Sequence, residues 1–263
     1  MKKNVLVVGL NKSGTSILTY RIAAGLKTEK IYFEPKSNEG LNNLTIHKNF
    51  ILSDHSVTKC LWNPYQFNRV YDIGKLYTKN IWIIRDPRDV LISSFFYYWY
   101  HGHNPDKMQF QKYIALVKKK ESNPQSISWM EMTKGRNNPL HYLKTVYIPL
   151  INTINILEKL GWFILKYEDF ISGKIDPLNK YLGFQVDKSA EVHKRVERVK
   201  RSEKHENWRD YFTDEDVKLL KSEFNPILSE LHYNQLDWNL NYPYSLDPSL
   251  GSDYMLQINH ESK

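Results

Sequence analysis

The chain has 263 residues, of which 41% are hydrophobic and 25% are charged. This balance suits a globular protein with a sizeable core, and no apolar run approaches the ~18 residues that a transmembrane helix needs. A single cysteine, Cys60, excludes an internal disulfide and a cysteine-based zinc site, so we expect a cytoplasmic protein. The formal net charge of +8 favours an anionic partner but does not choose among nucleotides, nucleic acids, acidic glycans and membrane surfaces.

The first third of the chain alternates short apolar runs with helical patterns. Residues 5–9 are apolar and β-branched, which is typical of a buried parallel strand. An amphipathic stretch over residues 15–26 predicts a helix. Further strands are predicted at residues 31–33, 57–61 and 80–85.

The middle of the chain continues this pattern after an interruption. A helix is predicted over residues 86–100, with a proline in its first turn, where the missing N–H group costs nothing. Residues 101–138 are polar, and we expect an irregular segment there in which Lys118–Lys120 form a solvated face. A long helix over 140–160 and a buried strand over 162–167 follow.

Strands that alternate with helices predict the fold class. We expect an α/β protein, a single domain with a central parallel sheet flanked by helices. This domain is placed at residues 1–238, and residues 239–263 are expected to form a tail of uncertain structure.

The loop Gly9–Ser16 carries the strongest functional signal. It lies between a predicted strand and a predicted helix, where unpaired N–H groups and the helix dipole favour a phosphate or sulfate oxygen. A Walker A loop would place its lysine where Thr15 stands, whereas here the lysine is Lys12. We therefore expect a nucleotide without a γ-phosphate. The alternative is a tight strand-to-helix turn that binds no ligand.

A second anion site is predicted after the strand at residues 80–85. Arg85 ends that strand, and Ser93 lies two turns into the next helix, so both can reach the carboxyl edge of the sheet, where ligands bind in open α/β folds. Arginine offers a planar fork that suits phosphate. The alternative is that Asp86 caps the helix while Arg85 pairs with Asp89 in a surface salt bridge.

These motifs resemble the sulfotransferase family that uses 3'-phosphoadenylyl sulfate. Lys12–Ser16 (Lys-Ser-Gly-Thr-Ser) is similar to the family's 5'-phosphosulfate loop, and Arg85 with Ser93 is similar to its 3'-phosphate motif at the same separation. Tyr167, in Tyr-Glu-Asp, resembles a tyrosine that lies near the adenine in some members. Arg201, seven residues before Trp208, resembles a late arginine that also touches the 3'-phosphate, although Ser-Glu stands here where many members have Lys-Gly.

The resemblance implies a P-loop-like sulfotransferase architecture and a set of roles. The donor would be 3'-phosphoadenylyl sulfate, the product would be adenosine 3',5'-bisphosphate, and no metal would be needed. Lys12 would act on the leaving-group side, and Ser93 would hold Lys12 away until the acceptor arrives. The residues expected to bind the nucleotide are Lys12, Ser13, Gly14, Thr15, Ser16, Arg85, Ser93, Tyr167 and Arg201.

The general base is less well marked. Glu34 ends the strand at residues 31–33 and is followed by a proline, at a place where carbohydrate-type sulfotransferases often have a carboxylate base. An ordinary surface carboxylate or a substrate-binding one is an equal alternative. His55 is the second candidate. The small-molecule branch of the family has a histidine in the segment that corresponds here to Lys59-Cys60-Leu61, and this chain has none.

The leading hypothesis is a sulfotransferase that acts on a hydroxyl, of a glycan or glycolipid more than of a small phenol. A P-loop-type nucleotide kinase is the enzymatic alternative, which the lysine position disfavours. A nucleotide-binding or nucleic-acid-binding protein without catalysis is the alternative that the positive charge suggests, although we expect no specific nucleic acid as a partner.

Overall fold

The structure is a computed structural model that describes residues 2–35, 38–52, 54–135 and 139–260. The chain divides into two units, each continuous in space but not in sequence. We call residues 1–85 and 149–197 the sheet unit, and residues 86–148 and 198–263 the helical unit. Each is described by itself.

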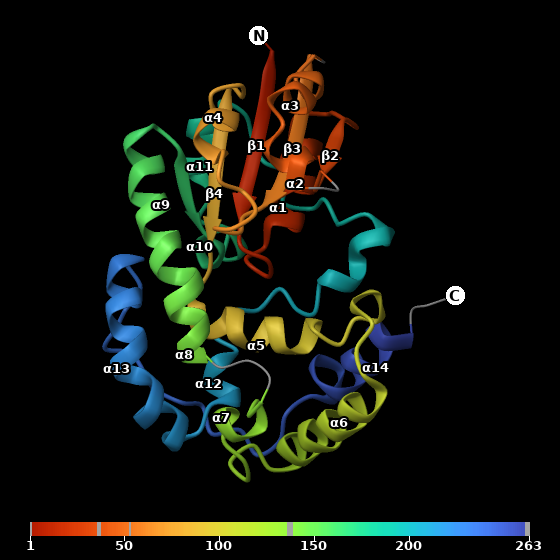
Figure 1. Cartoon of the computed structure of the whole chain (residues 1–263), viewed down its shortest axis with the longest axis vertical. Helices are drawn as coiled ribbons and strands as arrows, with labels where there is room; N and C mark the ends of the chain where they lie inside the picture. The colour runs from red at the N-terminus through yellow and green to blue at the C-terminus, as the bar shows by residue number, and fades with distance from the viewer. Residues whose placement is uncertain (1, 36–37, 53, 136–138, 261–263) are drawn as a thin grey trace. The chain divides into compact units, whose positions relative to one another are not determined.

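The sheet unit is built on five parallel strands in the order β2-β3-β1-β4-β5, with β1 between β3 and β4 (Figure 1). Their bounds are β1 Lys3–Gly9, β2 Ile31–Phe33, β3 His55–Leu61, β4 Lys79–Ile84 and β5 Phe163–Lys166. Because β3 and β4 lie on opposite sides of β1, the carboxyl ends of these three strands lie at the topological switch point, the place at which open α/β sheets bind ligands. The predicted α/β class with a parallel sheet flanked by helices is confirmed.

Alternation along the strands builds a core on each face of this sheet. Val5 and Val7 of β1 pack on one face with Leu18 of helix α1, whereas Leu6 and Val8 point to the other face, where Trp82 is also fully buried. The helices of the sheet unit are α1 Thr15–Gly25, α2 Asn38–Asn42, α3 Leu44–Phe50, α4 Val70–Gly74, α9 Ile148–Lys159, α10 Tyr167–Ile171 and α11 Asp176–Leu182.

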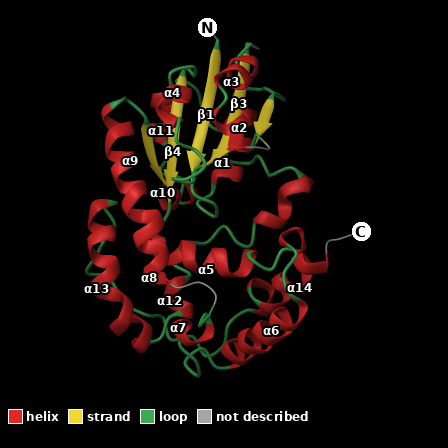
Figure 2. Cartoon of the chain, in the orientation of Figure 1, coloured by secondary structure: helices red, strands yellow, loops and turns green. Residues whose placement is uncertain are grey.

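The helical unit has an aromatic core, and its described residues contain no strand (Figure 2). The rings of Phe95 and Trp129 lie 5.1 Å apart, and those of Phe96 and Tyr211 lie 5.5 Å apart, all four buried. Its helices are α5 Pro87–Tyr97, α6 Lys107–Ser122, α7 Trp129–Met132, α8 Pro139–Tyr142, α12 Trp208–Tyr211, α13 Asp214–Glu230 and α14 Ser252–His260, with short η segments at His101–His103, Leu143–Tyr147 (a π turn) and Pro248–Leu250. A further short 3-10 segment, Lys194–Val199, includes the point in the sequence at which the sheet unit ends and the helical unit resumes.

The prediction of an irregular segment over 101–138 is wrong, because α6 occupies residues 107–122. The signals for a helix are present: Asp106 caps it by accepting from the backbone N–H group of Gln109 at 2.7 Å, and buried side chains recur at helical spacing. The solvated-face interpretation also fails for Lys120, which is buried and donates to the carbonyl oxygens of Pro124 (2.8 Å) and Ile127 (2.6 Å). Lys118 and Lys119 are exposed, as expected.

The predicted tail is ordered in large part. Helix α14 buries Tyr254, Met255 and Ile258 within the helical unit. Residues 261–263, the end of the predicted tail, lie outside the described residues. The boundary at residue 238 itself stays a prediction.

Candidate functional site

The loop between β1 and α1 is shaped by two glycines and one left-handed lysine. A Cβ atom on Gly9 would lie 2.6 Å from the Ile83 carbonyl oxygen and 2.7 Å from Ser13 Oγ, so only glycine fits there. Lys12 has a φ of +62° and Gly14 a φ of +92°, and the Ser13 hydroxyl donates back to the Leu10 carbonyl oxygen at 2.6 Å. Helix α1 then begins without a side-chain cap, so its first-turn N–H groups are left for water or a ligand.

Residues from the ends of β4 and β5 hold this loop in place. Arg85 Nη1 donates to the Lys12 carbonyl oxygen at 3.2 Å, and the Arg85 guanidinium lies 4.4 Å from the centre of the Tyr167 ring. The same ring packs on Gly14 so closely that a Cβ atom there would collide with it. The structure thus brings together Lys12, Gly14, Arg85 and Tyr167 at the carboxyl edge of one sheet.

Tyr167 and Arg85 therefore have a structural part in the loop besides any contact with a nucleotide. Tyr167 is buried, and its ring faces the loop and Arg85. A contact between Tyr167 and adenine stays a prediction. Arg85 is also buried, and its bond to Lys12 links the two predicted anion sites directly.

Glu34 lies at the same edge and has a partner that sequence reasoning missed. Its carboxylate accepts a hydrogen bond from the buried Lys59 ammonium, and its backbone N–H donates to the Lys59 carbonyl oxygen at 3.0 Å. The Lys59 ammonium also lies 4.1 Å from the centre of the Phe33 ring. Glu34 has a φ of +46°, and its side chain is 40% exposed against 4% for Lys59. No local sequence signal links the two residues; they meet because Phe33, the last residue of β2, pairs with Lys59 of β3.

His55 lies at the opposite edge of the sheet. It begins β3, and its Nδ1 accepts from the backbone N–H group of Lys3 at 3.2 Å, at the start of β1. Lys59 lies four positions further along the strand, a length of about 13 Å. Since the phosphate loop and Glu34 follow strand ends, we do not retain His55 as a base.

Ser93 and Arg201 belong to the helical unit. Ser93 is buried on α5. Arg201 Nη1 donates to the Leu250 carbonyl oxygen at 2.6 Å, and its guanidinium lies 4.9 Å from the centre of the Phe96 ring. Its Nε is buried and has no hydrogen-bond partner among the described residues.

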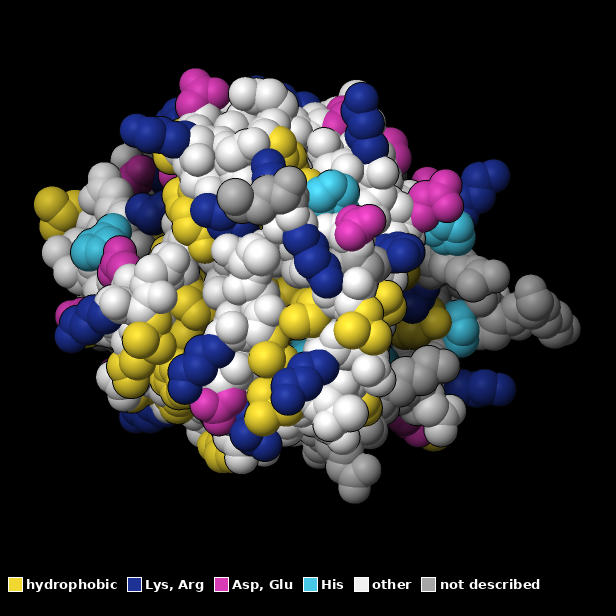
Figure 3. Space-filling model, turned by 90° about the horizontal axis from the view of Figure 1, so that it is seen from above, with side chains coloured by type: hydrophobic (Ala, Val, Ile, Leu, Met, Phe, Trp, Pro, Cys, Tyr) yellow, Lys and Arg dark blue, Asp and Glu magenta, His cyan; other side chains and the backbone are white. Residues whose placement is uncertain are grey.

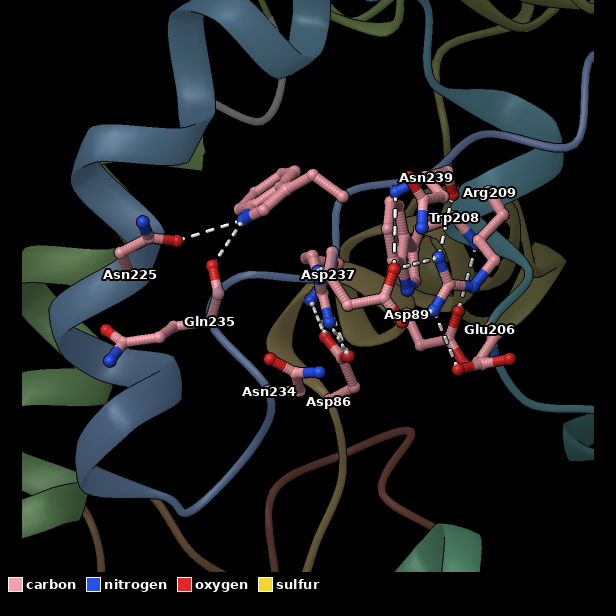
Figure 4. Close-up of polar contacts among 12 residues, drawn as sticks. Asp86, Asp89, Glu206, Trp208, Arg209, Asn225, Asn234, Gln235, Asp237 and Asn239 are labelled. Carbon is pink, nitrogen blue, oxygen red and sulfur yellow. Dashed lines mark hydrogen bonds and ion pairs between the residues drawn. The ribbon is translucent and has the colours of Figure 1, made fainter.

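The Asp-Pro-Arg-Asp segment after Arg85 organises the start of α5 and the segment before α12. Asp86 accepts from the Arg88 backbone N–H group at 2.8 Å and pairs with the Arg88 guanidinium at 2.6 Å. Asp89 accepts from the backbone N–H groups of Glu206 (2.7 Å) and Trp208 (3.1 Å) (Figure 4). The expected helix cap by Asp86 is thus present, while Asp89 serves as a main-chain anchor.

Arg88 is an anchor of the same cluster that sequence reasoning overlooked. Its guanidinium lies 3.9 Å from the centre of the Trp208 ring and 4.9 Å from that of Trp238. Figure 4 also shows Arg209 bonded to Asp237 and Glu206 beside this cluster. The contacts of Arg88 and Asp86 are buried, whereas the bond from Arg209 to Glu206 is exposed, so the segment has an architectural part.

Surface charge, metal-ligating groups and helix length give three further observations. On the face seen in Figure 3, the described Lys and Arg side chains are scattered and alternate with acidic ones. Among the described residues, no group of three or more His, Cys, Asp or Glu side chains is placed to hold a metal ion. Nor does any helix in the described part of the chain combine the length and apolarity needed to span a bilayer.

Comparisons with known proteins agree with this geometry. In a structure of mouse sulfotransferase SULT7A1 complexed with PAP, 85% of the chain aligns with 87% of this one at 14% identity and a TM-score of 0.50. A retinol dehydratase in a complex with retinol and PAP aligns over 84% of its chain and 92% of this one, at 14% identity and a TM-score of 0.44. At these identities the first likeness shows the fold alone. A search among curated proteins finds no matching relative. The family model described as the sulfotransferase domain matches residues 2–232, and the chain therefore belongs to the sulfotransferase family.

Proposed function

We propose that this sulfotransferase moves the sulfuryl group of 3'-phosphoadenylyl sulfate to a hydroxyl of a carbohydrate-type acceptor. The observation that carries the proposal is the bond from Arg85 to Lys12, which joins a phosphate loop and a second anion-binding motif on neighbouring strand ends. A donor with anionic groups on both its 5' and 3' sides suits two such sites. The complex of the mouse sulfotransferase with PAP supports the same donor.

The residues present fit this donor better than a triphosphate. The uncapped start of α1 offers N–H groups to a 5'-phosphosulfate. Thr15 stands where a Walker A lysine would reach β and γ phosphates, and Lys12 stands at the mouth of the loop instead. In the helical unit, the buried Arg201 Nε is a donor that still needs an acceptor, as a 3'-phosphate oxygen would provide.

The proposed chemistry assigns one task to each side chain. Glu34 takes the proton of the acceptor hydroxyl while the acceptor oxygen forms a bond to sulfur and the bond from sulfur to the 5'-phosphate oxygen breaks. Lys12 donates to that departing oxygen and neutralises its charge. Ser93 restrains Lys12 in the absence of acceptor, a role that rests on the family motif.

Glu34 suits the role of base because Lys59 orients its carboxylate. The Lys59 ammonium is buried and donates to the carboxylate, while part of the carboxylate remains exposed and can meet an acceptor. Such a bond holds the carboxylate in one orientation, as proton abstraction from a positioned hydroxyl requires. A carboxylate at this place, with no histidine in Lys59-Cys60-Leu61, is our ground for a carbohydrate-type acceptor.

Calorimetry tests the donor, and a transfer assay tests the acceptor. We expect adenosine 3',5'-bisphosphate to bind much more tightly than ATP with magnesium, and tight binding of ATP alone would refute the proposal. With radiolabelled 3'-phosphoadenylyl sulfate, we expect label on oligosaccharides or glycolipids in a mixed panel. Transfer to phenols only would contradict the acceptor class, and transfer to nothing despite nucleotide binding would favour a non-catalytic protein.

A further inference from the structure

The end of the chain forms a structure that the family match does not include. The match ends at residue 232, and residues 246–260, which we call the C-terminal hook, comprise a short 3-10 turn and helix α14. Within the helical unit α14 packs against α5 and α6 (Figure 1). The hook is therefore a defined element and not a loose terminus.

A buried carboxylate on α6 fixes the start of α14. Glu121 accepts from the backbone N–H of Ser252 at 2.6 Å and from its hydroxyl at 2.8 Å, while the Glu121 carbonyl oxygen accepts from the Leu246 N–H at 2.9 Å. A negative charge at a helix N-terminus is favourable, and burial strengthens it. At the other end of α14, the Asn259 amide donates to the Trp99 carbonyl oxygen at 3.0 Å.

The hook in turn holds the segment that carries Arg201. The Leu250 carbonyl oxygen accepts from Arg201 Nη1 at 2.6 Å, and the Tyr254 hydroxyl donates to the Arg198 carbonyl oxygen at 2.8 Å. The hook thus bonds to the side chain of Arg201 and to the main chain three residues earlier. The aromatic rings of Phe96 and Tyr211, 4.9 and 5.8 Å from the guanidinium, complete its surroundings.

This geometry leaves the Nε donor of Arg201 without an acceptor. Its Nη1 is taken by Leu250, and its Nε is buried without a hydrogen-bond partner among the described residues. An arginine that is fixed on one side and unsatisfied on another is prepared to receive an anion, because its ordering has already been completed before binding.

We infer that the C-terminal hook positions Arg201 and thereby sets the preference of the protein for nucleotides with a 3'-phosphate. This inference rests on the proposed function, in which Arg201 contacts that phosphate. It goes further, because it makes residues beyond the family match part of donor recognition. A merely structural hook would stabilise the helical unit and affect all nucleotides alike.

The experiment compares two nucleotides that differ only in the 3'-phosphate. Dissociation constants for adenosine 3',5'-bisphosphate and adenosine 5'-monophosphate are measured by calorimetry, and their ratio is the readout. Tyr254→Phe removes one hydroxyl bond and leaves the ring in place, so it should fold, and we expect the ratio to fall about fivefold. A chain ending at residue 245 should lose more. Tyr242→Phe is the matched control, because Tyr242 precedes the hook and its hydroxyl donates to Asp214 of α13, so its loss should not change the ratio.

Arg201→Ala separates failure of the inference from failure of the proposed function. If the wild type shows the preference and Arg201→Ala abolishes it, Tyr254→Phe must reduce it too. An unchanged ratio in Tyr254→Phe, or an equal weakening of both nucleotides, would overturn the inference alone. A wild type without preference would overturn both, whereas an Arg201→Ala variant that keeps the preference would overturn the inference and leave the proposed function to Arg85.

Discussion

The two units fix their polar side chains by different means. In the sheet unit, Glu34 and Arg85 follow directly after a strand and Lys12 lies in the loop after β1, and their surroundings come from neighbouring strand ends. In the helical unit, buried carboxylates accept main-chain N–H groups from distant segments. Asp216 of α13, for example, accepts from Trp129 at 2.7 Å and Met130 at 2.9 Å, more than eighty residues earlier. We therefore expect substitutions in the first set to change activity, and substitutions in the second to change stability.

The sharpest test of this comparison is Glu34→Gln. The amide keeps the size of the side chain but cannot take a proton, so we expect kcat to fall roughly 10²- to 10⁴-fold. Binding of adenosine 3',5'-bisphosphate and the melting temperature should stay close to those of the wild type. Sulfuryl transfer and calorimetry measure these quantities, and full activity would identify Glu34 as an ordinary surface carboxylate.

Lys12→Ala should have the next largest effect. Loss of a positive group at the leaving oxygen costs roughly 10²- to 10³-fold in kcat, whereas nucleotide binding through the backbone should weaken much less. Because Lys12 has a φ of +62°, Lys12→Gly serves as a second variant that relieves any backbone strain. The two variants should lose the same activity. A glycine variant with restored turnover would mean that loop shape, and not the ammonium, matters.

Asp216→Asn tests the other side of the comparison. The Asp216 carboxylate accepts from Trp129, Met130 and the N–H and hydroxyl groups of Thr213. Bonds to a charged acceptor are strong, and an amide cannot replace all of them, so the free energy of unfolding should fall by about 3 kcal/mol. Urea denaturation measures this loss, and kcat at low temperature should be unchanged. Asp214→Asn, on the exposed first turn of the same helix, is the control.

Prediction from sequence worked best in the sheet unit. The strands around Val5–Gly9 and Asn80–Arg85 are short apolar runs between turn signals, and such runs report burial in a parallel sheet directly. In contrast, α6 was not predicted. The polar residues of this region, Lys118 and Lys119 among them, indicated an irregular segment, although apolar residues recur there at helical spacing. Burial of Lys120 depends on the loop after α6 returning two carbonyl oxygens to its ammonium, which periodicity cannot show.

The parts of the site that belong to local sequence motifs could be predicted. The loop around Lys12 follows from a strand, a glycine and a helix start. The pairing of Glu34 with Lys59 depends on the register of two neighbouring strands, and no sequence motif shows that register. The anchoring of Trp208 by Asp89 needs a contact over more than one hundred residues. Long-range pairing of this kind is decided by packing, not by local pattern.

Lys59→Met refines the sheet-unit side of the comparison with a smaller effect. Without the ammonium, Glu34 loses the donor that orients its carboxylate, so we expect kcat to fall about tenfold. Lys59→Arg keeps a donor at this position and should restore much of the activity, as measured by sulfuryl transfer. An equal loss of kcat in both variants, together with a lower melting temperature, would indicate that Lys59 only supports the fold.

The smallest expected effect concerns Lys120 and the pH dependence of stability. Burial lowers the pKa of Lys120 from 10.5 to about 8 in the folded state. Between those values the unfolded chain binds more protons, so this group makes the free energy of unfolding rise with pH, and the dependence fades below about pH 7. Measured by urea denaturation from pH 8 to 9.5, the stability of the wild type relative to Lys120→Met should rise by about 1.5 kcal/mol. Lys119→Met, at the exposed neighbouring position, should show no such trend. If the stability difference between the wild type and Lys120→Met does not change with pH, the two carbonyl partners keep the ammonium charged in the folded protein. Burial of this cation would then carry no electrostatic cost.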